Sequence, residues 1–170
     1  MKRKRVYVGC RANVNRSFIV EQMLLKKLAE EALPIDIDSG GVMVDERFKN
    51  MTYYPGAIIE FILALQRMGL DYIIPNIRTH QARAFTTTDI QNADLILTMT
   101  RKQRDHLKQY VAPDTQVMLL SQLKDPACEE NIFDAMQERI MTVEAFVLQI
   151  AQLQYYLDVE RIKALLDRAR

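Results

Sequence analysis

The sequence contains only two cysteines, Cys10 and Cys128, among its 170 residues. Two cysteines in a chain of this size do not make a disulfide framework and favour a reducing compartment, so the fold is not expected to depend on a disulfide. The chain also lacks an apolar run of the roughly 20 residues that a transmembrane helix needs. Its basic residues 2–5 lead into a strand rather than into the apolar core of a signal peptide. We therefore expect a cytoplasmic protein.

An excess of charge of either sign is missing too, since 23 basic and 22 acidic side chains leave a formal net charge of +1. Such a balance gives no bulk attraction to nucleic acids or membranes, so neither is expected as a partner. Residues 2–5 are interpreted as a solvated chain end, with a nucleic-acid or lipid patch as the alternative. The length and a hydrophobic content of 49% fit one folded domain, residues 1–170.

Apolar residues follow strand and helix periods in alternation along the chain. Strands are predicted at residues 6–9, 35–38, 93–99 and 116–120, with residues 39–41 forming a turn. Helices are predicted at about residues 17–32, 56–68 and 101–110, with a short one after a cap at residues 87–89 and a long one from residue 129 onward. Residues 70–85 are predicted to be a long loop, a kind of segment that is often functional.

Strands that alternate with helices predict a parallel sheet covered on both faces by right-handed crossovers. We expect one doubly wound α/β domain whose four strands have the order 2-1-3-4. In such sheets ligands bind beyond the carboxyl ends of the strands, where the chain order switches. Residues 10–17 leave the carboxyl end of the first predicted strand, so the fold places them at the expected binding position.

Residues 10–17, Cys-Arg-Ala-Asn-Val-Asn-Arg-Ser, have a composition suited to a phosphate. The loop can turn its N–H groups inward, and the helix that begins near Arg16 adds free N–H groups and a positive dipole end. This field stabilises a thiolate, so Cys10 is predicted to be a nucleophile. Arg16 can bind two phosphoryl oxygens, and Ser17 can donate to the sulfur. The residues expected to bind phosphate are Arg11, Ala12, Asn13, Val14, Asn15, Arg16 and Ser17.

A buried, inert cysteine at a strand end is the alternative interpretation of Cys10. The segment resembles, however, the phosphate loop of the low-molecular-weight protein tyrosine phosphatases, Cys-x-Gly-Asn-x-Cys-Arg-Ser. Cys10, Asn13, Arg16 and Ser17 match this pattern, while Ala12, Asn15 and Phe18 stand for its glycine, its second cysteine and the proline that follows. If that glycine has a positive φ, Ala12 strains the loop by about 1–2 kcal/mol.

Further segments resemble the same family, over about residues 6–157. Asp38-Ser39-Gly40-Gly41 and His80-Gln81-Ala82-Arg83 are similar to two of its motifs. The resemblance implies that Ser39 and His80 support the loop through Asn13, together with Ser17. Asp125-Pro126 resembles the Asp-Pro pair that holds the general acid, a role that cleavage of a phosphate ester requires. Ala127 stands where an aromatic residue commonly follows, and Tyr53 and Tyr54 are candidate aromatic walls.

The leading hypothesis is a phosphomonoester hydrolase, a protein-tyrosine phosphatase that forms a cysteinyl-phosphate on Cys10 and uses Arg16 and Asp125, without metal or cofactor. Expected partners are a phosphotyrosine-containing protein or a small aryl phosphate, and inorganic phosphate or sulfate in the loop. Val14 favours phosphotyrosine over phosphoarginine, because arginine-phosphatase relatives carry threonine there.

Two other functions stay open on the sequence. One is a phosphate-binding or phosphoprotein-binding module whose catalysis is impaired by the changes at Ala12, Asn15, Phe18 and Ala127. The other is a thioredoxin-linked arsenate reductase, which the resemblance makes less favourable because residues 82–90 lack the two further cysteines of that relay and Cys128 alone cannot complete it. Loss of the second loop cysteine at Asn15 also predicts that the usual protective disulfide is absent.

Overall fold

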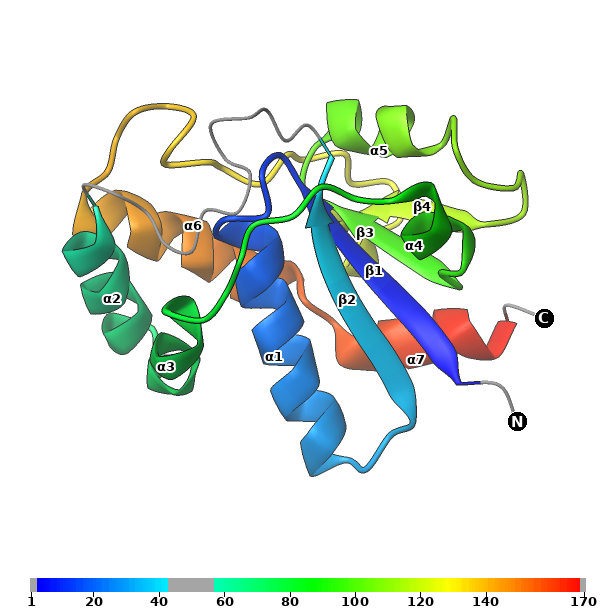
Figure 1. The fold of residues 1–170 in the computed structure, drawn as a ribbon, viewed down its shortest axis with the longest axis horizontal. Helices are drawn as coiled ribbons and strands as arrows, with labels where there is room; N and C mark the ends of the chain where they lie inside the picture. Colours follow the sequence, from blue (N-terminus) through cyan, green and yellow to red (C-terminus); the bar gives the residue numbers. More distant parts are fainter. Residues whose placement is uncertain (1–2, 43–56, 169–170) are drawn as a thin grey trace.

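The structure is a computed structural model that describes residues 3–42 and 57–168. A parallel sheet with the strand order β2-β1-β3-β4 forms its centre (Figure 1). The strands are β1 Lys4–Cys10, β2 Ile35–Gly41, β3 Leu95–Thr98 and β4 Gln116–Leu119. The predicted α/β class and the strand order 2-1-3-4 are therefore confirmed.

Helices cover both faces of this sheet. They are α1 Arg16–Glu30, α2 Ile58–Arg67, α3 Ile74–Ile77, α4 Thr87–Gln91, α5 Arg101–Leu107, α6 Val143–Tyr156 and α7 Val159–Arg168, with 3-10 turns η1 Asp71–Ile73 and η2 Leu120–Leu123. Helices α1, α2, α6 and α7 share the larger apolar core, whereas α4 and α5 pack on the opposite face (Figure 1). Within the described ranges, no helix has the length and apolar character needed to cross a membrane.

The central strand β1 is buried on both faces because its side chains alternate between two cores. Val6 and Val8 belong to the larger core under α1, and Tyr7 belongs to the smaller core under α4 and α5. Successive side chains of a strand point to opposite faces, so both faces of a covered strand must be apolar. This arrangement makes the run before Cys10 continuously hydrophobic and holds the carboxyl end of β1 in place.

Residues 39–41 continue β2 instead of forming the predicted turn. Ser39 pairs with Val8 and Gly41 with Cys10 in the parallel register. At Gly40, a Cβ atom would lie 1.9 Å from the Tyr7 hydroxyl oxygen, so glycine is needed there for close packing rather than for a bend. The extended strand places Ser39 beside the loop that follows β1.

The predicted loop at residues 70–85 is also wrong in its first half, which forms η1 and α3. Helix α2 stops as expected at Gly69, whose φ is +69° and whose neighbour Leu70 donates its N–H to the Leu65 carbonyl (2.9 Å). The predicted start of this helix at Gly56 lies outside the described residues. The short helices were hidden because Pro75, which suits a first helical turn, also suits a loop.

The long helix predicted from residue 129 onward is wrong in its first part and in its continuity, although α6 and α7 form in the rest of it. Residues 129–142 are not helical, α6 begins only after the cap Thr142, and the helix breaks again at Leu157 before α7. The Ile132 N–H donates to the Met99 carbonyl at the end of β3 (2.8 Å), which ties this segment to the sheet. Ile132 and Ala135 are buried in the core without a helix, whereas Ile140 and Met141 are exposed, so the apolar spacing of this segment does not reflect a helical face. The segment, yellow to orange in Figure 1, runs above the carboxyl ends of the strands.

Candidate active site

The loop between β1 and α1 surrounds the sulfur of Cys10 with hydrogen-bond donors. The Asn13 N–H lies 3.2 Å from Cys10 Sγ, and the Ser17 hydroxyl donates to the same sulfur at 3.0 Å. Asn13 has a φ of +56°, so it, and not Ala12, takes the left-handed conformation that turns the loop. Asparagine tolerates this conformation better than most residues. Ala12 does not have a positive φ, so the backbone strain that such a conformation would cause there is absent.

Arg16 opens helix α1 and is 1% exposed. Its Nη1 donates to the Ile132 carbonyl (3.1 Å), and its Nη2 pairs with the carboxylate of Asp134. Its Nε has no hydrogen-bond partner within residues 3–42 and 57–168. A buried guanidinium donor without a partner is costly, so this Nε is a ready site for an anionic oxygen.

A network of side chains holds the loop from below. Asn13 Nδ2 donates to Ser17 Oγ (3.0 Å) and to Ser39 Oγ (2.8 Å), and His80 Nε2 donates to the Asn13 carbonyl (2.6 Å). The structure thus brings together the four residues assigned to the supporting network. Phe18 stacks on the His80 ring with centroids 4.3 Å apart, a contact that the sequence comparison with proline at this position did not suggest.

Two titratable groups at this network, Glu21 and His80, have pKa values that are shifted from their ordinary values. Ser39 Oγ donates to Glu21 Oε2 at 2.8 Å. Burial raises the pKa of Glu21, and the nearby Asp38 raises it further, while the Ser39 hydrogen bond and Arg83 oppose the shift. Burial lowers the pKa of His80, helped by Arg83 and opposed by the bond to the Asn13 carbonyl. His80 is therefore neutral at pH 7.

The loop forms the floor of a cavity of about 70 Å³, a volume suited to a small anion. Its wall on the far side comes from residues 129–142, which contribute Asp134, Met136 and Gln137. Asn15 Nδ2 contacts the Met136 sulfur (3.0 Å), so the loop and this wall touch directly. The remaining lining residues are Cys10, Arg11, Ala12, Val14, Asn15 and Arg16. A sulfur, a guanidinium and a carboxylate thus converge on one small space.

The sequence model of the family described as low molecular weight phosphotyrosine protein phosphatase matches residues 5–140. The chain belongs to this family. The match covers the loop, the network and Asp134, and it confirms the resemblance drawn from the loop motif. No curated protein sequence matches the chain.

Solved structures of the family share the fold at low sequence identity. Wzb of Vibrio vulnificus, in complex with benzylphosphonate, is 21% identical with a TM-score of 0.71, over 95% of this chain and 99% of that chain. The low molecular weight protein tyrosine phosphatase of T. tengcongensis is 17% identical with a TM-score of 0.72, over 95% and 98%. The YwlE arginine phosphatase is 16% identical with a TM-score of 0.69, over 98% and 97%, and YwlE of Bacillus subtilis has also been determined as a mutant.

Asp125 lies away from this family site. Its side chain is exposed and accepts a hydrogen bond from the Ala127 N–H (2.9 Å), closing a small local turn, and it is not among the residues that line the cavity. The structure brings Asp134 to Arg16 instead. Sequence reasoning misses Asp134 because the Asp125-Pro126 pair matches the family pattern and the apolar spacing of residues 129–142 predicts a helix. The apolar pair Ile132-Phe133 ahead of Asp134 was the available signal, since it anchors the segment in the core.

The candidate wall tyrosines and the two cysteines differ in their relation to the cavity. Tyr53 and Tyr54, the candidate aromatic walls, lie outside the described residues. Cys128 is a free, partly exposed cysteine that does not line the cavity. Cys10 is also free and is 3% exposed. Among the residues that line the cavity, Cys10 is the one thiol.

Proposed function

We propose that this protein is a phosphomonoester hydrolase that forms a cysteinyl-phosphate on Cys10. The observation that carries the proposal is the convergence of two hydrogen bonds on the Cys10 sulfur, beside an Arg16 Nε that has no partner among the residues that the structure describes. Donors that converge on a sulfur stabilise its thiolate, which is the nucleophilic form. Arg16 and the loop N–H groups bind the phosphoryl oxygens, and the charge that builds up on them is stabilised in place.

Asp134 acts as the general acid in this proposal, in place of Asp125. The Cys10 sulfur attacks phosphorus, the bond from phosphorus to the leaving oxygen breaks, and Asp134 gives that oxygen its proton. Water then attacks the cysteinyl-phosphate, Asp134 takes the water proton, and the bond from sulfur to phosphorus breaks to release phosphate. The ion pair between Asp134 and Arg16 belongs to the anion-free site, because a phosphate competes with the carboxylate for the guanidinium.

Phosphotyrosine is the substrate class that the cavity wall supports best. Val14 and Met136 line the cavity with apolar surface against which an aromatic ring packs favourably. The complex of Wzb with benzylphosphonate, a compound with an aromatic ring beside its phosphonate, is consistent with this choice. The YwlE arginine phosphatase makes phosphoarginine the competing substrate. Turnover of a phosphotyrosine peptide should therefore exceed turnover of a phosphoarginine peptide of the same sequence.

Hydrolysis of p-nitrophenyl phosphate tests the proposal directly. The wild-type protein should turn over, and Cys10→Ser should lose turnover while inorganic phosphate still binds, because the serine hydroxyl is a far weaker nucleophile. Cys128→Ser is the matched control and should keep wild-type turnover, since Cys128 does not line the cavity. Phosphate binding by a wild-type protein that shows no turnover would instead indicate a phosphate-binding module.

A further inference from the structure

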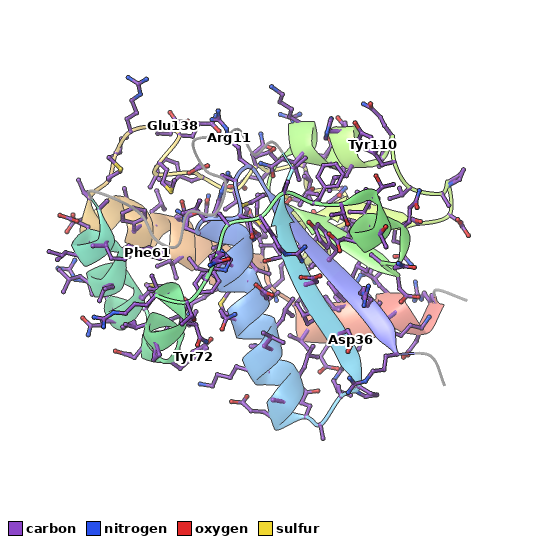
Figure 2. The ribbon with its side chains drawn as sticks, in the orientation of Figure 1. Arg11, Asp36, Phe61, Tyr72, Tyr110 and Glu138 are labelled. Carbon is purple, nitrogen blue, oxygen red and sulfur yellow. The ribbon has the colours of Figure 1, made fainter. Side chains whose placement is uncertain are left out.

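A second cavity, of about 300 Å³, adjoins the phosphate pocket. The two cavities share Arg11 and Gln137 as lining residues, so they are neighbours at the side chain that follows the nucleophile. The larger cavity, called the side groove here, is lined by Arg11, Thr100, Lys102, Gln103, Asn131 and Gln137. In Figure 2, Arg11 lies between the segment that carries Glu138 and helix α5. A substrate held in the phosphate pocket therefore has the side groove directly beside it.

The fixed polar groups of the side groove are oriented as donors. Gln103 is 4% exposed, and its Oε1 accepts from the Met99 N–H (3.2 Å). Asn131 Oδ1 accepts from the Arg101 N–H (2.8 Å). Because each amide oxygen is already bonded, each amide presents its NH₂ group as the remaining polar group. Neither NH₂ group has a hydrogen-bond partner within the part of the chain that the structure describes.

Neither of the two cations of the side groove has an acidic partner among the described residues. Arg11 and Lys102 form no ion pair with any residue in 3–42 and 57–168. Other basic residues nearby do have acidic partners: Arg16 pairs with Asp134, and Arg101 and Arg104 pair with Glu129. Two cations without an ion pair in the described ranges and two amide donors around one cavity attract an anion, whereas the whole chain carries a formal charge of only +1.

We propose that the side groove is a specificity subsite for a carboxylate next to the phosphorylated residue of a peptide substrate. The inference rests on the proposed function, because it takes the phosphate pocket as the place of the scissile phosphate. The volume of the side groove admits an aspartate or glutamate side chain. Arg11 and Lys102 supply the complementary positive charge. Such rim charges select substrates by attraction and by salt-sensitive association more than by tight binding.

Paired phosphotyrosine peptides test the subsite. One peptide carries aspartate on both sides of phosphotyrosine, and the other carries asparagine at the same positions. The wild-type protein should prefer the acidic peptide in kcat/KM by about 3- to 10-fold at low salt, and the preference should shrink as salt is added. Lys102→Ala should lower this ratio toward one, and Lys102→Glu should reverse it. Lys108→Ala, an exposed lysine just after α5 that removes the same charge, should keep the wild-type ratio.

The outcomes separate this inference from the proposed function. Turnover of both peptides without a preference, or an equal preference in Lys102→Ala and Lys108→Ala, overturns the subsite and leaves the phosphatase intact. If no phosphate ester is turned over, the proposed function fails, and the subsite is then decided by binding. Calorimetry of Cys10→Ser with the two peptides should show tighter binding of the acidic one, and equal affinities would overturn the subsite.

Discussion

Asp125 and Asp134 differ in their exposure and in the groups that their carboxylates contact. Asp125 is exposed and its carboxylate closes its own turn, so nothing holds it toward the sulfur of Cys10. Asp134 lines the phosphate pocket and contacts Arg16. A general acid must lie within hydrogen-bond reach of the leaving oxygen, directly or through one water. Geometry thus favours the aspartate that has no proline after it.

Substitution of each aspartate by asparagine should separate the two roles. Asp134→Asn should lower kcat for phenyl phosphate about 10²- to 10³-fold, because the leaving phenoxide needs a proton. The loss should be smaller with p-nitrophenyl phosphate, whose leaving group is more stable as an anion. Asp125→Asn is the matched variant and should retain nearly full activity. A large loss in Asp125→Asn together with an active Asp134→Asn would restore the assignment made from the sequence.

The raised pKa of Glu21 predicts how the stability of the fold depends on pH. Because burial raises its pKa in the folded protein, the native state binds more protons than the unfolded chain between the ordinary glutamate pKa and the raised one. Stability is therefore lost as pH rises through this window. Glu21→Gln keeps an oxygen for the Ser39 hydroxyl and should raise Tm by a few degrees at pH 7, with the gain fading near pH 4.5. Glu138→Gln, at an exposed position, should leave Tm unchanged in thermal scans, and an equal rise there would contradict the burial argument.

The helix α6 and the segment 129–142 act together to place Asp134. The Ala135 N–H donates to Gln149 Oε1 (3.1 Å) and the Phe133 N–H donates to Gln152 Oε1 (2.8 Å), so two glutamines of α6 bracket the aspartate. Gln149 is fully buried, and its Nε2 has no partner among the described residues. Its side chain therefore serves the segment through its oxygen alone.

Gln149→Leu removes this single acceptor while nearly conserving side-chain volume. The Ala135 N–H is left unpaired, which should cost about 1–3 kcal/mol of stability. Because Asp134 loses its anchor, kcat for phenyl phosphate should fall about 10-fold while affinity for inorganic phosphate changes little. Gln154→Leu is the control on the same helix, since Gln154 bonds the Met68 carbonyl and not the segment. Equal kcat values in the two variants would show that Gln149 does not position the acid.

Phosphate binding should stabilise the whole molecule against unfolding, because the loop forms a binding site only in the folded chain. At a phosphate concentration of 100 times Kd, binding adds about 2.7 kcal/mol, or roughly 5–10 °C in Tm for a chain of this size. The reference is chloride at equal ionic strength. Arg16→Lys should lose most of this rise, because an ammonium cannot reproduce the planar guanidinium contacts. Arg67→Lys, whose exposed side chain pairs with Glu144, should keep it. A full rise in Arg16→Lys would place phosphate elsewhere.

Much of the architecture could be predicted because it depends on local patterns. Short apolar runs predict strands β1, β3 and β4, and the helical period of residues 17–32 predicts α1. Errors arose where one pattern fits two structures. Glycines that suggest a turn at residues 39–41 serve close packing in β2, and apolar spacing that suggests a helix at residues 129–142 belongs to a core-anchored segment. Only contacts from distant residues separate these alternatives.

The amino-acid order by itself determined the loop chemistry, because Cys10, Asn13, Arg16 and Ser17 lie within eight positions between a strand and a helix. Their spacing largely determines how these side chains are arranged around the Cys10 sulfur. Tertiary structure alone decided which acid faces them, since Arg16 and Asp134 are 118 positions apart. The one local signal, the apolar pair Ile132-Phe133 ahead of Asp134, predicts a buried anchor but does not show which aspartate reaches Arg16. The choice follows from the hydrogen bonds that tie residues 129–142 to β3 and to the glutamines of α6.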